Sequence, residues 1–162
     1  LDHSVENNIA ITSLSTFANA GVIRQRESRA AVLEQMKRLH LRASAVDLPV
    51  KALSGGNQQK AALARWLLRD SGVLILDEPT RGVDIGAKRE IYELIDALAR
   101  SGKAVLVISS DLPEAIGIGD RLLVMREGRI VKELVSAEAT EEDVILHATG
   151  ARAPAPIRET QE

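Results

Sequence analysis

Two glycines follow a serine at the start of a predicted helix, a pattern that can bind a phosphate group. They are Ser54, Gly55 and Gly56, in the run Leu53-Ser54-Gly55-Gly56-Asn57-Gln58-Gln59-Lys60. Glycines have no Cβ, so backbone N–H groups can approach an anion closely. A helix N-terminus adds unpaired donors and the positive end of its dipole. The Ser54 hydroxyl could bond the same phosphate. Because serine is a favoured helix cap, an ordinary N-cap after a Gly-Gly turn is the alternative.

Two adjacent carboxylates form a second candidate site. Asp77 and Glu78 come directly after the apolar run Val73–Leu76. In nucleotide hydrolases the first such aspartate holds Mg²⁺, usually through water, and the next carboxylate can polarise an attacking water. Successive side chains of a strand diverge and can therefore serve two tasks. The alternative is that both residues are only the polar exit of a strand.

A third group of polar residues, Ser109-Ser110-Asp111, follows the apolar run Ala104–Ile108. It would lie at the carboxyl end of a strand and could contribute a hydrogen bond to a bound phosphate. These residues could equally do no more than cap the next helix, which is the favoured interpretation when they are taken alone.

The elements that would position these residues alternate between strands and helices. Two short apolar runs predict strands that are buried on both faces, Val73–Leu76 and Ala104–Ser109. Between them, Ile85–Arg100 has apolar residues at helical spacing, with Asp84 as its cap and Gly102 at its end. This alternation predicts an α/β domain with a mostly parallel sheet, in which ligands bind at the carboxyl ends of the strands.

The segment before this region is predicted to be helical with polar loops. Ser28 is expected to cap a helix that runs to about His40, and Pro49 interrupts a connection over residues 42–53. A further helix is expected from about Asn57 to Arg69, ended by Gly72. Three of its side chains are predicted to form the buried face: Leu63, Trp66 and Leu67.

The C-terminal part carries signals for a capped helix, a hairpin and a last helix. Asp111 and Glu114 resemble a capping box, and Glu127-Gly128 predicts a turn between two strands. Those strands are Arg121–Met125 and Arg129–Val135, followed by a short helix over Glu141–Ala148. The tail from Ala151 has two prolines and no periodicity, which predicts disorder.

Composition excludes several classes of protein. The 162 residues carry a net charge of −2, and 45% of them are hydrophobic, which is typical of a globular chain. The mildly acidic balance and the aromatic share of 2% argue against a nucleic-acid partner. With no cysteine the sequence has neither a disulfide scaffold nor a thiolate zinc site. Its longest apolar runs are far shorter than a membrane-spanning helix requires.

Taken together, the motifs resemble the ATP-binding subunits of ABC transporters. Ser54–Gly56 match that family's signature motif, Asp77 its Walker B aspartate, Glu78 its catalytic glutamate, and Gly82-Val83-Asp84 its D-loop. Asn57-Gln58-Gln59-Lys60 narrows the likeness to the second ATPase domain of monosaccharide importers, of the ribose, xylose, arabinose and galactose kind. The resemblance implies an incomplete P-loop NTPase fold. Residues 1–53 would be part of the helical subdomain and its connection, 54–150 the core, and 151–162 a tail.

The sequence departs from the family pattern at two points. No Gly-x-x-x-x-Gly-Lys-Ser/Thr loop is present, although this loop grips the β- and γ-phosphates. With no initiator methionine, this predicts that the chain is a fragment without ATPase activity of its own. The family's switch histidine would fall at Ser110, which cannot supply an imidazole, so hydrolysis at this domain's own site is placed in question.

The resemblance implies a mechanism shared between two ATPase domains. Ser54, Gly55, Gly56 and Gln58 would contact ATP that is held by the phosphate loop of the partner domain. Asp77, with Mg²⁺ held through water, and Glu78 would serve this domain's own ATP, and Asp84 would lie near the interface between the domains. Closure would drive a membrane permease supplied by a periplasmic sugar-binding protein. The subunit would lie on the cytoplasmic face of the bacterial inner membrane.

Two other functions remain as alternatives. One is a DNA-associated ABC-type ATPase, although the chain has neither the heptads nor the cysteines that typically flank such ATPases. The other is a regulatory ABC domain that does not hydrolyse ATP, as the absent loop and Ser110 suggest. Glu78 argues against the second, because an inactive site has no use for a glutamate there.

Overall fold

Two compact units make up the chain in the computed structural model, residues 1–108 and residues 109–162. The structure describes residues 2–151, without the side chain of Ala43, so the predicted tail lies almost wholly outside the described residues. No helix in this described range is long and apolar enough to cross a membrane.

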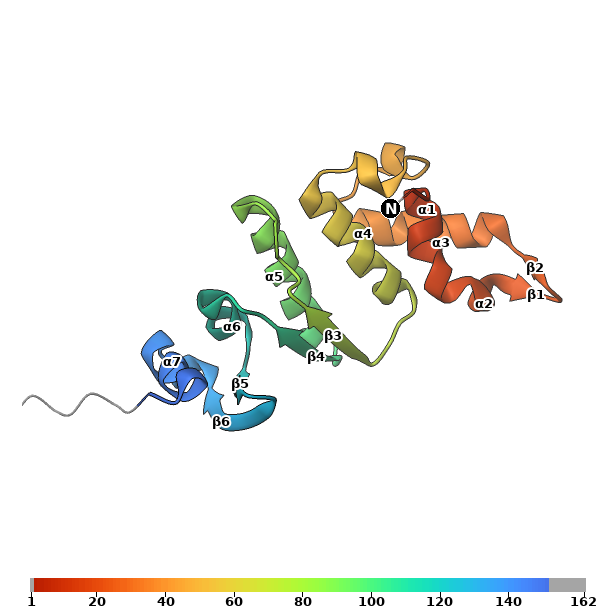
Figure 1. Cartoon of the computed structure of the whole chain (residues 1–162). Helices are drawn as coiled ribbons and strands as arrows, with labels where there is room; N and C mark the ends of the chain where they lie inside the picture. The colour runs from red at the N-terminus through yellow and green to blue at the C-terminus, as the bar shows by residue number, and fades with distance from the viewer. Residues whose placement is uncertain (1, 152–162) are drawn as a thin grey trace, which may run out of the picture. The chain divides into compact units, whose positions relative to one another are not determined.

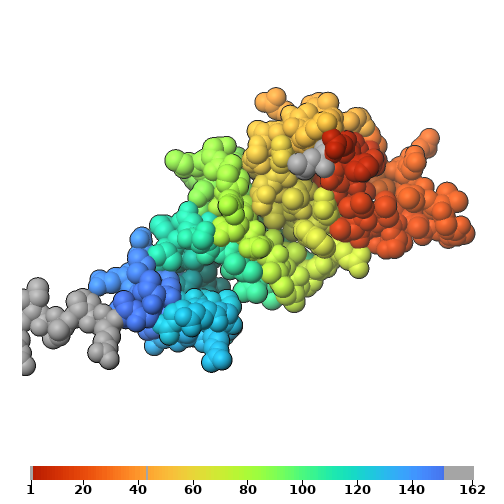
Figure 2. Space-filling model, viewed as in Figure 1, coloured from red at the N-terminus to blue at the C-terminus, as the bar shows by residue number. Residues whose placement is uncertain are grey.

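The first unit begins with a bundle of helices (Figure 1). Its elements are α1 (Val5–Ala10), η1 (Ile11–Ser13), α2 (Leu14–Phe17), β1 (Ala18–Asn19), β2 (Val22–Ile23), α3 (Gln25–Arg38), η2 (Ala43–Ala45), η3 (Val50–Ala52) and α4 (Gly55–Leu68). α1 and α3 both pack against α4, and in the space-filling view the red, orange and yellow segments form one continuous mass (Figure 2). Their core includes Ile9, Val32, Met36 and Ala64, all fully or almost fully buried. The helical character predicted for residues 1–53 is therefore confirmed, apart from the unpredicted hairpin β1–β2.

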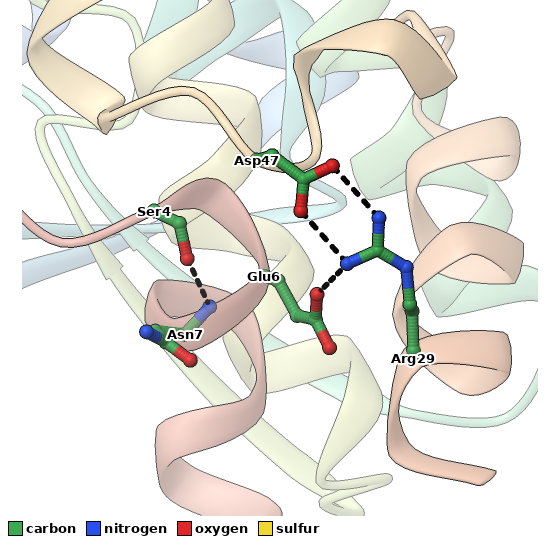
Figure 3. Close-up of polar contacts among 5 residues, drawn as sticks. All are labelled: Ser4, Glu6, Asn7, Arg29 and Asp47. Atoms are coloured by element: carbon green, nitrogen blue, oxygen red, sulfur yellow. Dashed lines mark hydrogen bonds and ion pairs between the residues drawn. The ribbon is translucent and has the colours of Figure 1, made fainter. Parts of the chain in front are cut away.

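An ion-pair cluster ties α1, α3 and the following loop together (Figure 3). The guanidinium of Arg29 on α3 donates to Glu6 on α1 and to both carboxylate oxygens of Asp47, at 2.8 Å each. The hydrogen bond from Arg29 lowers the pKa of Asp47 below its ordinary value. Ser4 caps α1, because its hydroxyl accepts from the backbone N–H of Asn7 at 3.2 Å.

Three predictions about the helices of this unit are wrong. Ser28 does not cap α3, which starts at Gln25, and the Ser28 side chain is buried inside the helix. The left-handed residue after α4 is Asp70 (φ 55°) rather than Gly72. Trp66 is 47% exposed and lies off the buried face of α4, whose core-facing residues are Ala61, Leu63 and Ala64. Residue propensity and apolar spacing predict that a helix forms. Which face of the helix is buried depends on the elements that pack against it.

The parallel strands β3 (Val73–Asp77) and β4 (Ala104–Ile108) flank α5 (Ile85–Arg100) in the sequence. Leu74 and Leu76 are buried, whereas Val73 and Ile75 are about two-thirds exposed, at 64% and 65%. The prediction of strands buried on both faces is therefore wrong for both strands, since Leu106 is also 47% exposed. α5 contacts β4. On the other face of the sheet, the side chains of Val73, Ile75 and Leu106 are exposed.

The second unit contains α6 (Leu112–Ile118), β5 (Arg121–Arg126), β6 (Arg129–Val135), η4 (Ser136–Glu138) and α7 (Glu141–Thr149). β5 and β6 form the predicted hairpin, with Glu127 (φ 49°) and Gly128 (φ 75°) in the left-handed conformation that its turn needs. The predicted last helix is confirmed as α7, which starts with a capping box between Thr140 and Asp143. The fold is thus α/β, as expected, with one parallel and two antiparallel strand pairs within residues 2–151.

Candidate functional site

The N-terminus of α4 presents a hydroxyl that caps nothing. Ser54 is the N-cap by backbone geometry (φ −61°, ψ 157°), and its carbonyl accepts from the backbone N–H of Gln58 at 2.8 Å. Its side chain makes no capping hydrogen bond and is exposed. The side chains of Ser4, Asp84, Asp111 and Thr140 all cap their helices. The ordinary N-cap alternative therefore accounts for the backbone of Ser54 but not for its hydroxyl.

The two glycines let α4 approach the first turn of α5 and the segment that precedes it. A Cβ on Gly55 would lie 3.3 Å from the carbonyl oxygen of Gly82. A Cβ on Gly56 would lie only 2.8 Å from the Cβ of Ala87, closer than real Cβ atoms come. Gly56 is buried and Gly55 is exposed. Gly56 is therefore needed for close packing, whereas Gly55 and Ser54 face outward, where the first N–H groups of the helix have no intrahelical acceptor.

Asp84 joins this arrangement as the confirmed cap of α5. Its Oδ1 accepts from the backbone N–H of Ala87 at 3.0 Å. Its other oxygen, Oδ2, is 3.9 Å from the position that a Cβ on Gly56 would take. The structure thus brings Gly56 and Asp84 together, although 28 residues separate them in the sequence. The role of Asp84 at an interface between domains stays a prediction.

Asp77 and Glu78 lie at the carboxyl end of β3, as predicted. Asp77 pairs with Ile108 in the parallel register and is exposed. The backbone N–H of Glu78 donates to the carbonyl of Ile108 at 2.8 Å, and Glu78 has a left-handed backbone (φ 47°). This conformation is costly for a residue with a side chain and is enriched at functional sites. Pro79 and Thr80, both fully or almost fully buried, anchor the turn that follows.

The donor chemistry at this end of the sheet suits Mg²⁺. Magnesium is usually held by one or two carboxylates together with substrate phosphates and several waters. An exposed carboxylate such as Asp77 can supply one such ligand to an ion that also binds a nucleotide. No group of three or more potential metal-ligating side chains occurs in residues 2–151. Asp77 as a ligand through water stays a prediction.

The side chains of the third group have different tasks. Asp111 caps α6, because its Oδ1 accepts from the backbone N–H of Glu114 at 3.2 Å. The hydroxyl of Ser109 accepts from the N–H of Asp111 at 3.0 Å and donates to the buried Glu114 at 3.1 Å. The capping alternative is thus confirmed for Asp111. Ser110, to which the resemblance assigns the place of the switch histidine, is exposed in the second unit, and its catalytic role stays a prediction.

Two further residues complete the surroundings of α4. The side-chain amide of Gln58 donates to the carbonyl of Leu53 at 2.8 Å and so stabilises the turn into the helix; contact of Gln58 with a nucleotide stays a prediction. Lys60 is buried (6% exposed) and forms an ion pair with Glu90 on α5. The sequence did not predict this pair, because lysine and glutamate usually lie on the surface. The two residues are also far apart in the sequence, so no local pattern indicates that they form an ion pair.

A family profile and curated relatives both match this sequence. The sequence profile described as "ABC transporter" matches residues 2–81. The chain is 48% identical over 150 residues to the ribose import ATP-binding protein RbsA of Oceanobacillus iheyensis, and 50% identical over 150 residues to RbsA 2 of Rhizobium meliloti. These alignments include 93% of this chain but only 30% and 29% of the relatives, so the chain spans less than a third of their length.

A solved structure agrees in fold. A dimeric ATP-binding cassette in a post-hydrolysis state, bound to ADP and Pi, superposes with a TM-score of 0.71 at 26% identity. The match covers 83% of this chain and 57% of that one. The α/β arrangement described above is therefore the arrangement of an ATP-binding cassette.

Proposed function

Since the chain belongs to the ABC transporter family of ATP-binding proteins, we propose that its protein binds and hydrolyses ATP to energise import of a monosaccharide through a membrane permease. The relatives at 48% and 50% identity are named as ribose import proteins, which supports a sugar of that class. The chain would be the latter part of the second of two tandem ATPase domains, as the resemblance of Asn57-Gln58-Gln59-Lys60 to that domain implies. That the chain spans less than a third of these relatives is compatible with this proposal.

The observation that carries this proposal is the Ser54 hydroxyl, which makes no capping hydrogen bond at the exposed, glycine-rich start of α4. We assign Ser54, Gly55 and Gly56, here named the signature segment, to the terminal phosphate of an ATP that the partner ATPase domain holds. A hydroxyl and the unpaired N–H groups of a helix N-terminus match a phosphate in both charge and hydrogen bonding. Closure of this segment over the phosphate completes the site and excludes water.

The domain's own site uses the carboxylates after β3. Mg²⁺, when bound, neutralises charge on the phosphate oxygens. Asp77 would hold the ion through water, and Glu78 would orient and polarise the attacking water. The left-handed backbone of Glu78, held by the bond from its N–H to Ile108 (2.8 Å), fixes the direction in which its side chain leaves the strand. Asp84 stabilises the start of α5 and thereby the surface that supports Gly56.

We propose three partners for the full-length protein. They are a second ATPase domain, a membrane permease and, indirectly, a periplasmic sugar-binding protein. The protein would then lie on the cytoplasmic face of the bacterial inner membrane. The dimeric state of the similar cassette supports pairing of two ATPase domains. A nucleic-acid partner has no support from the composition, with 2% aromatic residues and a net charge of −2.

A second candidate function rests on Ser110. A serine in the position of the switch histidine favours a domain that binds ATP and regulates its partner without turnover. Replacement of Glu78 by glutamine in the full-length subunit separates the two functions. Loss of a general base typically lowers the rate by about 10²–10⁴-fold, so a site that hydrolyses ATP would lose most of its turnover. A purely regulatory domain would show no change in kcat.

The test of the signature segment compares two serines that both start helices. In the full-length subunit reconstituted with its permease, we expect Ser54→Ala to lower sugar-stimulated ATP hydrolysis while the midpoint of thermal unfolding stays unchanged, because Ser54 makes no capping bond. Ser4→Ala is the matched control. It removes a true cap, worth about 1 kcal/mol of stability, and should leave turnover intact. Unchanged hydrolysis in Ser54→Ala would contradict the assignment.

A further inference from the structure

Lys60 is a buried cation on the helix that starts with the signature segment. Its side chain is 8% exposed and pairs with the Glu90 carboxylate, whose side chain is 45% exposed. Lys60 follows Gly56 by one helical turn on α4, and Glu90 follows Ala87 by about one turn on α5. The ion pair is therefore the next contact along both helices after the close approach of Gly56 to Ala87.

A pocket of about 180 Å³ that opens to solvent lies beside Lys60 and Glu90. It is also lined by Ile91 and Leu94 of α5 and by His40 after α3. Ile91 is buried, and Leu94 packs against the helical core. The ion pair and the close approach of Gly56 to Ala87 therefore act together with this apolar packing to hold α4 against the first half of α5.

We propose that Lys60 is a positioning residue, which through Glu90 holds the signature segment in fixed geometry relative to Asp84 and the start of α5. This inference rests on the proposed function, because it concerns the same site. A buried ion pair contributes little net stability, since the loss of hydration offsets the attraction, but it can specify one arrangement of the groups it joins. Precise placement of groups that contact the reacting phosphate has large effects on rate.

The opposite side of α4 is attached independently. Arg65 donates to the backbone carbonyl of Asn8 at 2.8 Å and to its side-chain oxygen at 2.9 Å. The hydroxyl of Thr12 donates to the carbonyl of Arg65 at 2.9 Å. These bonds join α4 to α1 and η1, away from α5. Thr12→Val therefore weakens the attachment of α4 without touching its contact with α5, and it provides a matched structural control.

The experiment measures kcat, the KM for ATP and thermal unfolding in the full-length ATPase subunit with its permease. We expect Lys60→Met to lower kcat by about tenfold, with a KM within twofold of the parent, since an interaction that acts only after ATP has bound affects kcat. The thermal midpoint should change little, because the Glu90 carboxylate left behind can reach solvent. Lys60→Arg keeps the charge and should retain most of kcat. Thr12→Val should lower the thermal midpoint and leave kcat unchanged.

Charge exchange gives a second criterion. The double variant Lys60→Glu with Glu90→Lys should recover kcat relative to either single exchange. If Lys60→Met retains the parent kcat while Ser54→Ala loses turnover, the positioning role is wrong and the proposed function stands. If neither variant loses turnover, the proposed function fails as well. If kcat falls in step with the thermal midpoint in both Lys60→Met and Thr12→Val, Lys60 acts only through stability and the inference is overturned.

Discussion

At the scale of single residues, Gly56 has two possible roles, contact with a phosphate and close packing of two helices. Its place in the signature segment suggests contact with a phosphate, but a side chain at this position would first meet Ala87 of the same chain. A Cβ at this position would lie 2.8 Å from the Cβ of Ala87 and would force α4 and α5 apart. Loss of activity in a bulky Gly56 variant would therefore not distinguish contact with a nucleotide from packing of the two helices.

A prediction follows for Gly56→Ala. Overpacking of a close contact costs about 1–3 kcal/mol, partly offset by the ~0.5–1 kcal/mol that alanine gains over glycine within a helix. We therefore expect a net loss of stability, measured by urea or thermal unfolding of the 162-residue chain. The second substitution Ala87→Gly removes the clashing Cβ and should recover part of this loss.

Gly72→Ala is the control for this prediction, because no atom lies within 4 Å of the Cβ that it would add. It should leave stability unchanged or slightly higher. Additive effects of Gly56→Ala and Ala87→Gly in the double variant would show that the two positions do not interact, contrary to the geometry.

The roles that the sequence predicts for the candidate site residues stay predictions, and the structure confirms only local features among them. Asp84 and Asp111 were predicted as helix caps, and both are confirmed, because capping depends on a few neighbouring residues. Ser54 looked like another cap, yet its hydroxyl makes no such bond. Two contacts join residues that are far apart in the sequence, so no local pattern predicts them. They are the close approach of Gly56 to Ala87 and the ion pair between Lys60 and Glu90.

At the scale of elements, the sheet formed by β3 and β4 has one covered and one open face. Leu74 and Leu76 are buried, while Ile75 and Leu106, which pair with each other in the register, are 65% and 47% exposed. The runs Val73–Leu76 and Ala104–Ile108 are apolar throughout, which is typical of strands covered on both sides. The apolar composition of these strands thus indicates that they are most stable when both faces are covered. Whether a face is buried depends on the elements that pack against it.

This open face leads to a prediction about self-association. Contiguous exposed apolar surface on a strand pair favours association between molecules. We expect the double variant Ile75→Thr with Leu106→Thr to reduce oligomers of the 162-residue chain, as measured by light scattering after gel filtration. Leu74→Ala, on the covered face, should instead lower stability by about 2–5 kcal/mol. A parent chain that is already monomeric at high concentration would contradict the expectation.

Elements were predicted best where the signal is local. The turn at Glu127-Gly128 was predicted from its turn residues and is confirmed. The short helix predicted over Glu141–Ala148 is confirmed as α7, whose capping box the sequence analysis did not identify. The start of α3 was misplaced because Ser28 resembles a cap but lies buried in the helix. The hairpin β1–β2 was missed because each of its strands has only two residues, too short for any alternation to show.

At the scale of the whole molecule, the sequence contains only some of the motifs that a nucleotide site needs. It supplies the signature segment and the carboxylates Asp77 and Glu78, but it has no Gly-x-x-x-x-Gly-Lys-Ser/Thr loop. That loop provides the backbone cradle and the lysine that bind the β- and γ-phosphates. Without it, the N-terminus of α4 and the two carboxylates are left to hold a tetra-anionic ligand, and the carboxylates repel it unless Mg²⁺ intervenes.

We therefore expect the 162-residue chain by itself to bind MgATP with a Kd above ~1 mM, a binding free energy less favourable than about −4 kcal/mol, and to hydrolyse none. Isothermal titration calorimetry measures the affinity, and phosphate release measures the hydrolysis. The full-length subunit is the positive control, since its phosphate loop should raise the affinity well above that of the isolated chain. Micromolar binding to the isolated chain would mean that the signature segment and Asp77 form a complete site within one molecule, which would contradict the assignment of the signature segment to ATP held by a partner.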